Sequence, residues 1–324
     1  MLTLTLSIRC VKSMLYFGAS IFSKILLINT LRKTLQVSQE RITFVRVKKL
    51  IIIALMMTVA LTARGQKLIP HITTHGGSEY LSDVAVIVCP GGSYYWLSKK
   101  WEGSEVATKL NEAGFDAFVL HYRHAGTRYF LFGPLTPIRS HHYPEALEDV
   151  TAAIKELKSK GYKKVALAGF SAGGHLVLLA GETLAGKREA AGSDGRKAAD
   201  IPEIDLIAAV YPVVTFTEDE IMHKRSRNAF LGGKRRNAEL RDALSLEKHV
   251  PANMPPVLLV NCKDDPTVDW RNSERMDAAL SAAGIPHKWL YYEQGGHGFG
   301  ASAEKNPHES ARWIDTFVEM LKNL

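Results

Sequence analysis

Cysteine is scarce in this chain of 324 residues, which contains only three. Two of them, Cys89 and Cys262, lie after residue 65, and no group of residues has the spacing of a metal site. The sequence therefore predicts no bound metal. Internal repeats and long low-complexity linkers are absent as well, which excludes a repeat architecture and favours one folded domain.

Long hydrophobic runs are also missing. The most apolar segment, residues 50–61, is shorter than the ~20 residues that a membrane-spanning helix needs. Basic residues at positions 46, 48 and 49 precede it, and a small-x-small cleavage site at residues 63–65 follows it, directly before Gln66. Charged, apolar and cleavage regions in this order are typical of a signal peptide.

A signal peptide begins close to the start of translation, whereas residues 1–44 precede this one. We interpret residues 1–44 as a mis-called start, with translation beginning near Val45 or Val47. The alternative is a genuinely long leader. Residues 1–65 then form a leader, with the signal peptide at 45–65, and residues 66–324 form the folded domain. We expect this domain to be periplasmic or secreted, with no membrane contact after cleavage.

The excess of positive charge belongs to the leader. Residues 1–65 hold ten of the 41 Lys and Arg residues and one of the 33 acids, which leaves 31 bases, 32 acids and a net charge of −1. The sequence therefore predicts no nucleic-acid partner. The basic runs at 224–227 and 234–236 are interpreted as solvated surface, with recognition of an acidic sugar as the alternative.

Short apolar runs alternate with helical patterns from residue 84 onward. We predict strands at 84–89, 116–122, 164–168, 205–211, 256–262 and 288–293, and helices at 102–113, 144–160, 173–185, 270–284 and 308–323. This alternation predicts an α/β fold with a mostly parallel central sheet and helices on both faces. Residues 185–203 have the composition of an exposed loop. Two long excursions, 125–143 and 213–250, follow strands and are expected to overhang the edge where such sheets place their sites.

A glycine-rich turn joins the third predicted strand to its helix. Residues 169–173 read Gly-Phe-Ser-Ala-Gly, with apolar runs at 165–168 and 176–180 on either side. This is the G-x-S-x-G pattern in a strand–turn–helix context, where a sharp turn exposes the serine oxygen beside a helix N-terminus. The pattern predicts a nucleophile at Ser171. The alternative is a turn whose glycines serve the backbone alone.

Two further residue types follow in the order serine, acid, histidine. Asp264 and Asp265 come after the strand at 256–260, and His297 lies among four glycines after the next strand. A serine needs a neutral imidazole to take its proton, and a carboxylate fixes the tautomer of that imidazole. We predict His297 as the base and one of the two aspartates as its partner. Alternatively, either aspartate starts the turn before Pro266, His297 is an ordinary loop residue, and Glu293 is the acid.

The segment after the first predicted strand reads Pro90-Gly-Gly-Ser-Tyr94. Glycines there resemble the HGGG-type loop whose N–H groups stabilise an oxyanion, although Pro90 replaces its histidine. We predict an oxyanion hole from the N–H groups of Gly92, Ser93 and Ala172; a plain Pro-Gly turn is the alternative. The rings of Tyr94, Tyr95 and Trp96 follow at once.

Histidines outside the loop of His297 have other expected roles. His175 directly follows the Gly-Phe-Ser-Ala-Gly turn and is expected to pack or to cap the helix, and His141 and His142 are expected to lie in a polar loop.

These pieces together resemble the α/β-hydrolase superfamily, and most of all its secreted acetylxylan-esterase-like branch of xylanase-B-like esterases and lipases. The resemblance covers roughly residues 75–322 and rests on residues 89–94, 169–176, 211–212, 265–268 with 272–273, and 295–300. By the D-x-x-V spacing it implies Asp265 rather than Asp264 as the acid, so Asp264 is expected to serve the turn. This sequence differs from the family pattern at Ser93, where many relatives carry a third glycine. In the strand order of this fold the strands that end at Cys89 and Cys262 are not neighbours, so no disulfide is expected.

The resemblance implies a secreted serine esterase that needs no cofactor and removes small acyl groups, above all acetyl, from xylan-type oligosaccharides. Tyr94 and Trp96 are expected to contact the substrate and to close a small acyl pocket, unless these rings belong to the core. The alternatives are a broad carboxylesterase or feruloyl esterase and a lipase-like hydrolase, followed by a peptidase or a non-catalytic carbohydrate-binding relative. The oligomeric state does not follow from the sequence.

Overall fold

The computed structural model describes residues 67–71, 82–133, 140–190 and 201–324. The predicted leader, signal peptide and start site lie outside the described residues. All described residues belong to one compact unit, Gly65–Leu324. No helix of the described segments is long and apolar enough to cross a membrane.

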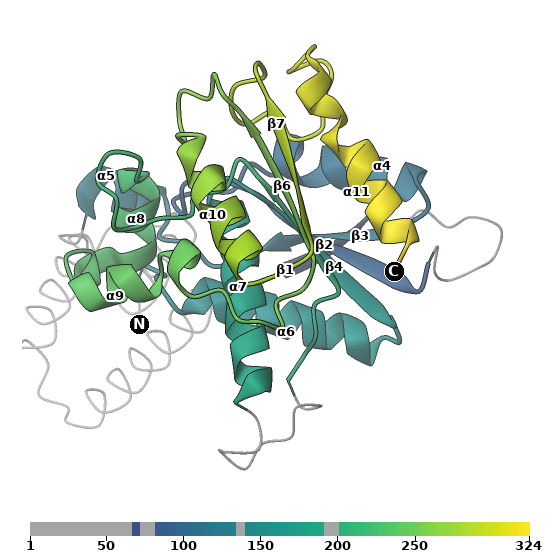
Figure 1. The fold of residues 1–324 in the computed structure, drawn as a ribbon, viewed down its shortest axis with the longest axis horizontal. Coiled ribbons are helices and arrows are strands. Elements are labelled where there is room, and N and C mark those ends of the chain that lie inside the picture. Colours follow the sequence, from purple (N-terminus) through teal and green to yellow (C-terminus); the bar gives the residue numbers. More distant parts are fainter. Residues whose placement is uncertain (1–66, 72–81, 134–139, 191–200) are drawn as a thin grey trace, which may run out of the picture. The chain divides into compact units, whose positions relative to one another are not determined.

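The core of this unit is a seven-stranded sheet in the order β1-β3-β2-β4-β5-β6-β7 (Figure 1). β1 pairs with β3 antiparallel and all other pairs are parallel. The strands are β1 (Lys67–His71), β2 (Val84–Cys89), β3 (Asp116–His121), β4 (Lys164–Phe170), β5 (Leu206–Val210), β6 (Val257–Cys262) and β7 (His287–Tyr292). The predicted α/β fold with a mostly parallel sheet is confirmed.

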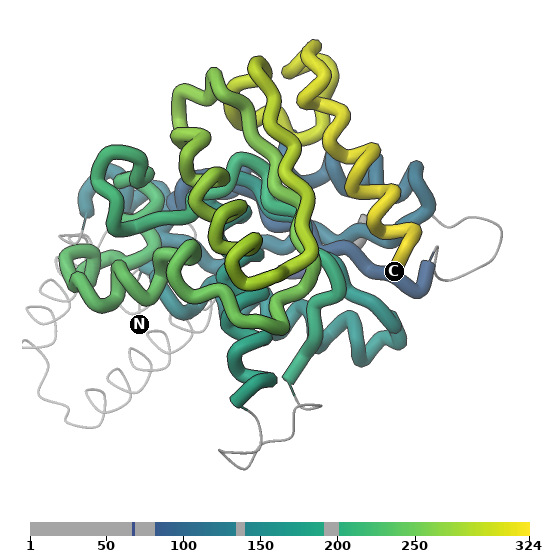
Figure 2. The backbone as a smooth tube through the Cα atoms, in the orientation of Figure 1, coloured from purple at the N-terminus to yellow at the C-terminus, as the bar shows by residue number. Residues whose placement is uncertain are grey.

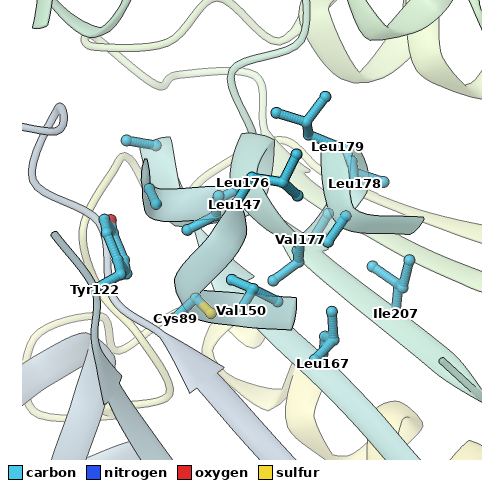
Figure 3. Close-up of a cluster of buried hydrophobic side chains, with 14 of the residues drawn as sticks. Cys89, Tyr122, Leu147, Val150, Leu167, Leu176, Val177, Leu178, Leu179 and Ile207 are labelled. Atoms are coloured by element: carbon cyan, nitrogen blue, oxygen red, sulfur yellow. The ribbon is translucent and has the colours of Figure 1, made fainter. Parts of the chain in front are cut away.

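Each face of the sheet carries its own hydrophobic cluster, because successive side chains of a strand point to opposite faces. In β2, the side chains of Ala85, Ile87 and Cys89 belong to one cluster and those of the alternate valines to the other. The first cluster packs against α6 (Glu145–Ser159), α7 (Ala172–Glu189) and α10 (Arg271–Ala282). Figure 3 shows part of it, with Val150 of α6 and Leu176 of α7 near Cys89. The second packs against α4 (Glu105–Glu112) and α11 (Trp313–Lys322).

The predicted helices are present with shifted ends. A π-helical turn, η1 (Lys100–Ser104), precedes α4, and a 3₁₀ turn, η6 (Glu309–Arg312), precedes α11. The predicted start of the exposed loop at 185 is wrong, because α7 continues to Glu189 and buries Leu184 and Ala185.

Both long excursions carry short helices in their described parts, which sequence reasoning did not predict. These are α5 (Thr127–Phe132), α8 (Lys224–Leu231), η4 (Gly232–Lys234), α9 (Ala238–Ala243) and η5 (Leu246–Lys248). Figure 2 shows α5, α8 and α9 on the same side of the sheet. The Arg225 guanidinium lies 5.4 Å from the ring centre of Phe130, so α8 contacts α5.

Cys89 and Cys262 are buried free thiols. They end β2 and β6, which are separated in the sheet by β4 and β5. The prediction of no disulfide between them is confirmed.

Candidate active site

The turn between β4 and α7 holds Ser171 in a strained conformation, with φ 54° and ψ −116°. Such a positive φ is costly for a non-glycine residue and persists where its surroundings fix it. The Ser171 N–H donates to the carbonyl of Val210, 2.9 Å away, and the Ser171 carbonyl accepts the N–H of Val213 at 3.3 Å. Hydrogen bonds to the end of β5 therefore hold the turn.

The two glycines of this turn are there because of close backbone contacts. A Cβ on Gly169 would lie 2.2 Å from the Gly173 carbonyl oxygen, and a Cβ on Gly173 would lie 2.1 Å from the Cys89 carbonyl oxygen. No side chain fits at these distances. The G-x-S-x-G spacing thus allows α7 to start directly against β4 and the end of β2.

Loops at the carboxyl ends of three strands bring Ser171, His297 and Asp265 together. His297 Nε2 lies 3.0 Å from Ser171 Oγ, and His297 Nδ1 lies 2.6 Å from Asp265 Oδ2. The Asp265 side chain is 1% exposed and that of His297 14%. The three side chains form one continuous hydrogen-bonded chain, arranged to activate a serine.

The contacts of the two adjacent aspartates, Asp264 and Asp265, differ from the predicted ones. Asp265 Oδ1 accepts the N–H groups of Thr267 and Val268 at 2.7 and 3.0 Å, so Asp265 holds the turn as well as His297. Asp264 instead accepts the N–H groups of Gly295 and Gly296 at 3.2 and 2.8 Å. The prediction that Asp264 serves the turn is therefore wrong: its carboxylate holds the histidine loop.

Glu293, the alternative acid, lies elsewhere. Its side chain is 69% exposed and forms an ion pair with Lys263 at 3.0 Å. Glu293 is therefore held at the surface by a lysine.

The loop after β2 follows a run of left-handed residues, with φ 128° at Gly92, 55° at Ser93 and 59° at Tyr94. Gly91 abuts Ser171, since a Cβ added to it would lie 2.9 Å from Ser171 Cβ. The Gly91 N–H donates to Glu102 Oε2 at 3.0 Å and is occupied. Within the described part of the chain, the N–H groups of Gly92, Ser93 and Ala172 donate to no acceptor, so they remain available to an oxyanion.

The rings that follow this loop separate into core and surface. Tyr94 is 1% exposed, stacks on Phe230 at 4.4 Å and has its hydroxyl 2.9 Å from His175 Nδ1. The structure thus places Tyr94 in the core, as its alternative interpretation had it. Trp96 is 37% exposed and packs edge-on against Phe130 at 5.5 Å. Its contact with substrate stays a prediction.

His175, His141 and His142 have structural partners. His175 is fully buried between Tyr94 and the Leu244 carbonyl, which confirms the packing role, and burial lowers the pKa of His175 to about 4. His141 contacts Glu145, and His142 Nδ1 lies 2.6 Å from the Ala229 carbonyl oxygen.

Sequence reasoning missed a buried carboxylate beside the site. Glu102 of η1 is 3% exposed, and its Oε1 accepts the hydroxyl of Tyr211 at 2.9 Å. Tyr211 Oη in turn accepts the Gly300 N–H at 3.0 Å, and its ring centre lies 4.5 Å from that of His297. In the sequence Glu102 resembles any acid at the start of a helix, because the segments that contact it are far away in the chain.

His223 was missed as well. It precedes α8 with Nδ1 2.8 Å from Ser226 Oγ. Burial, together with the charges of His297 and Arg225, lowers the pKa of His223 to about 4. A second, neutral imidazole therefore lies within electrostatic reach of His297.

Groups of three or more metal-ligating side chains do not occur among the described residues.

Comparisons of the sequence with known proteins identify a family. A family model described as BD-FAE matches residues 78–280. The chain is 29% identical over 237 residues to endo-1,4-β-xylanase B of Butyrivibrio fibrisolvens, covering 71% of this chain and 34% of that protein. It is 27% identical over 226 residues to an acetylxylan esterase of Xylanibacter ruminicola, covering 68% of this chain and 42% of that protein. The chain thus spans less than half the length of these relatives.

Solved structures extend the comparison to the fold. An acetyl ester-xyloside bifunctional hydrolase from Caldicellulosiruptor lactoaceticus superposes with a TM-score of 0.65 at 25% identity, covering 82% of this chain and 90% of that chain. A carboxylesterase from Lactobacillus plantarum superposes with a TM-score of 0.58 at 21% identity, covering 80% of this chain and 91% of that chain, which shows a shared fold. Because the family model matches well over half of the sequence and the sheet has the expected topology, the chain belongs to the BD-FAE family and has the α/β-hydrolase fold.

Proposed function

We propose that the protein is a serine esterase in which Ser171 is the nucleophile, His297 the general base and acid, and Asp265 the residue that orients His297. The observation that carries this proposal is the chain of hydrogen bonds from Asp265 Oδ2 through both nitrogens of His297 to Ser171 Oγ. The acetylxylan esterase and acetyl ester-xyloside hydrolase among the similar proteins support the same chemistry.

The geometry suggests how the reaction proceeds. Asp265 Oδ2 accepts a hydrogen bond from the N–H at His297 Nδ1, which leaves the Nε2 lone pair facing Ser171 Oγ. Nε2 takes the hydroxyl proton as Oγ attacks the ester carbonyl, and the N–H groups of Ala172 and of Gly92 or Ser93 stabilise the oxyanion. His297 then gives its proton to the leaving alcohol. Water, activated by the same imidazole, releases the acid and restores the serine.

The substrate we propose is an acetylated xylan-type oligosaccharide, because two of the similar proteins are named for acetyl ester hydrolysis. A panel of acetyl, butyryl, octanoyl and feruloyl esters tests this assignment. The acetyl ester is expected to give the highest kcat/KM. Faster cleavage of the octanoyl ester would establish a lipase-like enzyme instead, and preference for the feruloyl ester would establish a feruloyl esterase.

A burst experiment tests the reaction class itself. With p-nitrophenyl acetate, an acyl-enzyme gives a stoichiometric burst of p-nitrophenol before the steady state. The burst is expected with the natural sequence and should vanish in Ser171→Ala. A protein that binds xylo-oligosaccharides but shows neither a burst nor steady-state ester hydrolysis would be a non-catalytic carbohydrate-binding relative. Cleavage of peptide amides in preference to esters would identify a peptidase.

We further propose that the protein is exported to the periplasm or secreted, which rests on the sequence pattern of residues 45–65. In this proposal a polysaccharide fragment outside the cytoplasm is the natural partner, and the enzyme needs no cofactor.

A further inference from the structure

One buried carboxylate joins three separate segments of the site. Glu102 Oε2 accepts the Gly91 N–H at 3.0 Å, in the loop after β2. Glu102 Oε1 accepts the hydroxyl of Tyr211, at the end of β5, at 2.9 Å. The same hydroxyl oxygen accepts the N–H of Gly300, in the loop that carries His297, at 3.0 Å. Glu102 thus connects the oxyanion loop to the histidine loop.

The contact with Gly91 fixes the oxyanion loop against the nucleophile. A Cβ on Gly91 would lie 2.8 Å from Glu102 Oε2 and 2.9 Å from Ser171 Cβ. The Glu102 carboxylate therefore contacts the oxyanion loop at Gly91, the same residue that lies against Ser171. Because the Gly91 N–H is bound, the following peptide planes have a fixed orientation, which determines where the free N–H groups of Gly92 and Ser93 point.

The contact with Tyr211 fixes the histidine loop. The Tyr211 ring lies 4.5 Å from the ring of His297. A Cβ on Gly300 would lie 1.9 Å from the Trp101 carbonyl oxygen, so this loop also touches the residue before Glu102. Movement of Glu102 would therefore displace the base as well as the oxyanion donors.

The hydrogen bonds of Glu102 fit a charged carboxylate. Burial raises the pKa of Glu102 above its usual value, and the charge of His297 and hydrogen bonds from Tyr211, Gly91 and Ser98 oppose this rise without cancelling it. Glu102 accepts every one of these hydrogen bonds and donates none. A carboxylate has the lone pairs for this, with Oε1 facing the Tyr211 hydroxyl and Oε2 facing the Gly91 N–H.

We propose that Glu102 is a positioning residue of the esterase, whose carboxylate holds the oxyanion loop and the histidine loop in register around Ser171 and whose negative charge stabilises the imidazolium of His297. The inference rests on the proposed function, in which His297 becomes charged as it takes the serine proton.

Other groups also face His297, and their charges contribute to the pH dependence of kcat/KM. Asp265 bonds Nδ1, the Tyr211 ring packs on the imidazole, and Asp264 holds the backbone of its loop. His223 is neutral at pH 7, because burial lowers its pKa to about 4. Replacing Glu102 by Gln leaves all of these groups in place and removes one negative charge.

The test compares Glu102→Gln, Glu102→Asp and Tyr211→Phe with the natural sequence, using p-nitrophenyl acetate. Glu102→Gln is expected to lower kcat by roughly 10- to 100-fold with little change in KM, because misplaced oxyanion donors act on the transition state. In the pH profile of kcat/KM, the acidic limb of Glu102→Gln should move to lower pH by about 1 unit, because a less stabilised imidazolium loses its proton more readily. Glu102→Asp and Tyr211→Phe keep the charge, so they should lower kcat and leave the limb in place.

Glu182→Gln is the control for replacing a buried glutamate outside these contacts. Because burial raises the pKa of Glu182 well above its usual value, this control reports the effect of the substitution on the fold and not the loss of a charge. It should leave kcat and the acidic limb unchanged. Circular dichroism and thermal unfolding of each variant show whether the fold persists. An unshifted acidic limb in a folded Glu102→Gln, or an equal loss in Glu182→Gln, would overturn the inference.

A measurement without substrate separates this inference from the proposed function. The titration midpoint of the His297 ring is followed by NMR, with its resonance identified by its loss in His297→Asn. The midpoint should fall in Glu102→Gln and stay in Glu182→Gln. A natural protein that hydrolyses no ester would refute the proposed function, whereas an active natural protein with equal midpoints in both variants would refute the role of Glu102 alone.

Discussion

Asp264 and Asp265 are neighbours in the chain, yet their carboxylates hold different parts of the site. Asp265 bonds the imidazole of His297 and Asp264 bonds the backbone of its loop. Asp265→Asn should lower kcat by roughly 10⁴-fold, because an amide no longer fixes the tautomer of the base. Asp264→Asn should stay within about tenfold of the natural sequence, a change of about 1.4 kcal/mol in the barrier, since its amide oxygen still accepts one N–H.

Steady-state kinetics with p-nitrophenyl acetate measures both aspartate variants. Ser171→Ala and His297→Ala give the background activity of the assay, because each should lower kcat by a factor on the order of 10⁶. If Asp264→Asn is inactive while Asp265→Asn remains active, the choice of carboxylate is wrong.

His175 contributes to stability in a way that depends on pH. It is fully buried, and its pKa falls from 6.5 to about 4 in the folded protein. Since the unfolded chain takes up the proton first, the stability due to neutral His175 is present above pH 6.5 and is lost as the pH falls toward 4. By pH 5 this loss reaches about 2 kcal/mol.

Urea unfolding at pH 7 and pH 5 measures the effect of His175. In His175→Gln the free energy of unfolding should change less between the two pH values, by about 2 kcal/mol, whatever the absolute stability of the variant. An equal pH dependence in both proteins would mean that His175 is not the group responsible.

At the scale of elements, the turn that carries Ser171 predicts opposite effects for two glycines of one helix. A Cβ at Gly173 would clash with the Cys89 carbonyl oxygen, whereas a Cβ at Gly186 meets nothing within 4 Å. Gly173→Ala should therefore lower the free energy of unfolding by about 1–3 kcal/mol and displace Ser171, with loss of activity. Gly186→Ala should raise stability by about 0.5–1 kcal/mol and leave activity unchanged, because alanine favours the helix. Urea unfolding and ester hydrolysis report both changes, and equal effects of the two substitutions would exclude the clash at Gly173 as the cause.

The elements that sequence reasoning predicted are those with a continuous apolar run or a clear stripe. Leu147, Val150, Ile154 and Leu157 form such a stripe, and all four are buried on α6. β1 was missed because it is a five-residue edge strand that contains Pro70, a residue tolerated at sheet edges and usually a sign against a strand. α9 buries none of its residues, so no periodic pattern marks it.

The residues of the site likewise fall into those that a local sequence pattern predicted and those that no local pattern marks. Ser171, His297 and the pair Asp264–Asp265 could be predicted as neighbours because each follows a strand in a turn with its own local pattern, and the resemblance selected Asp265, which the structure places against His297. Glu102 was missed because its burial arises from Gly91 and Tyr211, which approach it only in the folded protein.

At the scale of the whole molecule, the proposed cleavage before Gln66 coincides with the start of the sheet. β1 begins at Lys67, and its five residues pair with His121 through Ala117 of β3. A protein that starts at Gln66 therefore retains every strand of the sheet. One that starts at residue 72 lacks β1 and leaves an edge of β3 unpaired.

This difference gives a prediction for two truncated proteins. Residues 66–324 should fold and should hydrolyse p-nitrophenyl acetate as fast as the exported natural protein. Residues 72–324 should lose about 2–4 kcal/mol of the free energy of unfolding, because several net hydrogen bonds of the edge pair disappear. Its kcat should change less than its stability, since β1 lies at the opposite edge of the sheet from β6 and β7, whose loops carry Asp265 and His297.

Urea unfolding and kinetics measure both proteins, and N-terminal sequencing of the exported protein should read Gln66 first. An exported protein that retains residues 1–44 would refute both the cleavage site and the start near Val45, and equal stability of the two truncated proteins would mean that β1 adds nothing to the fold.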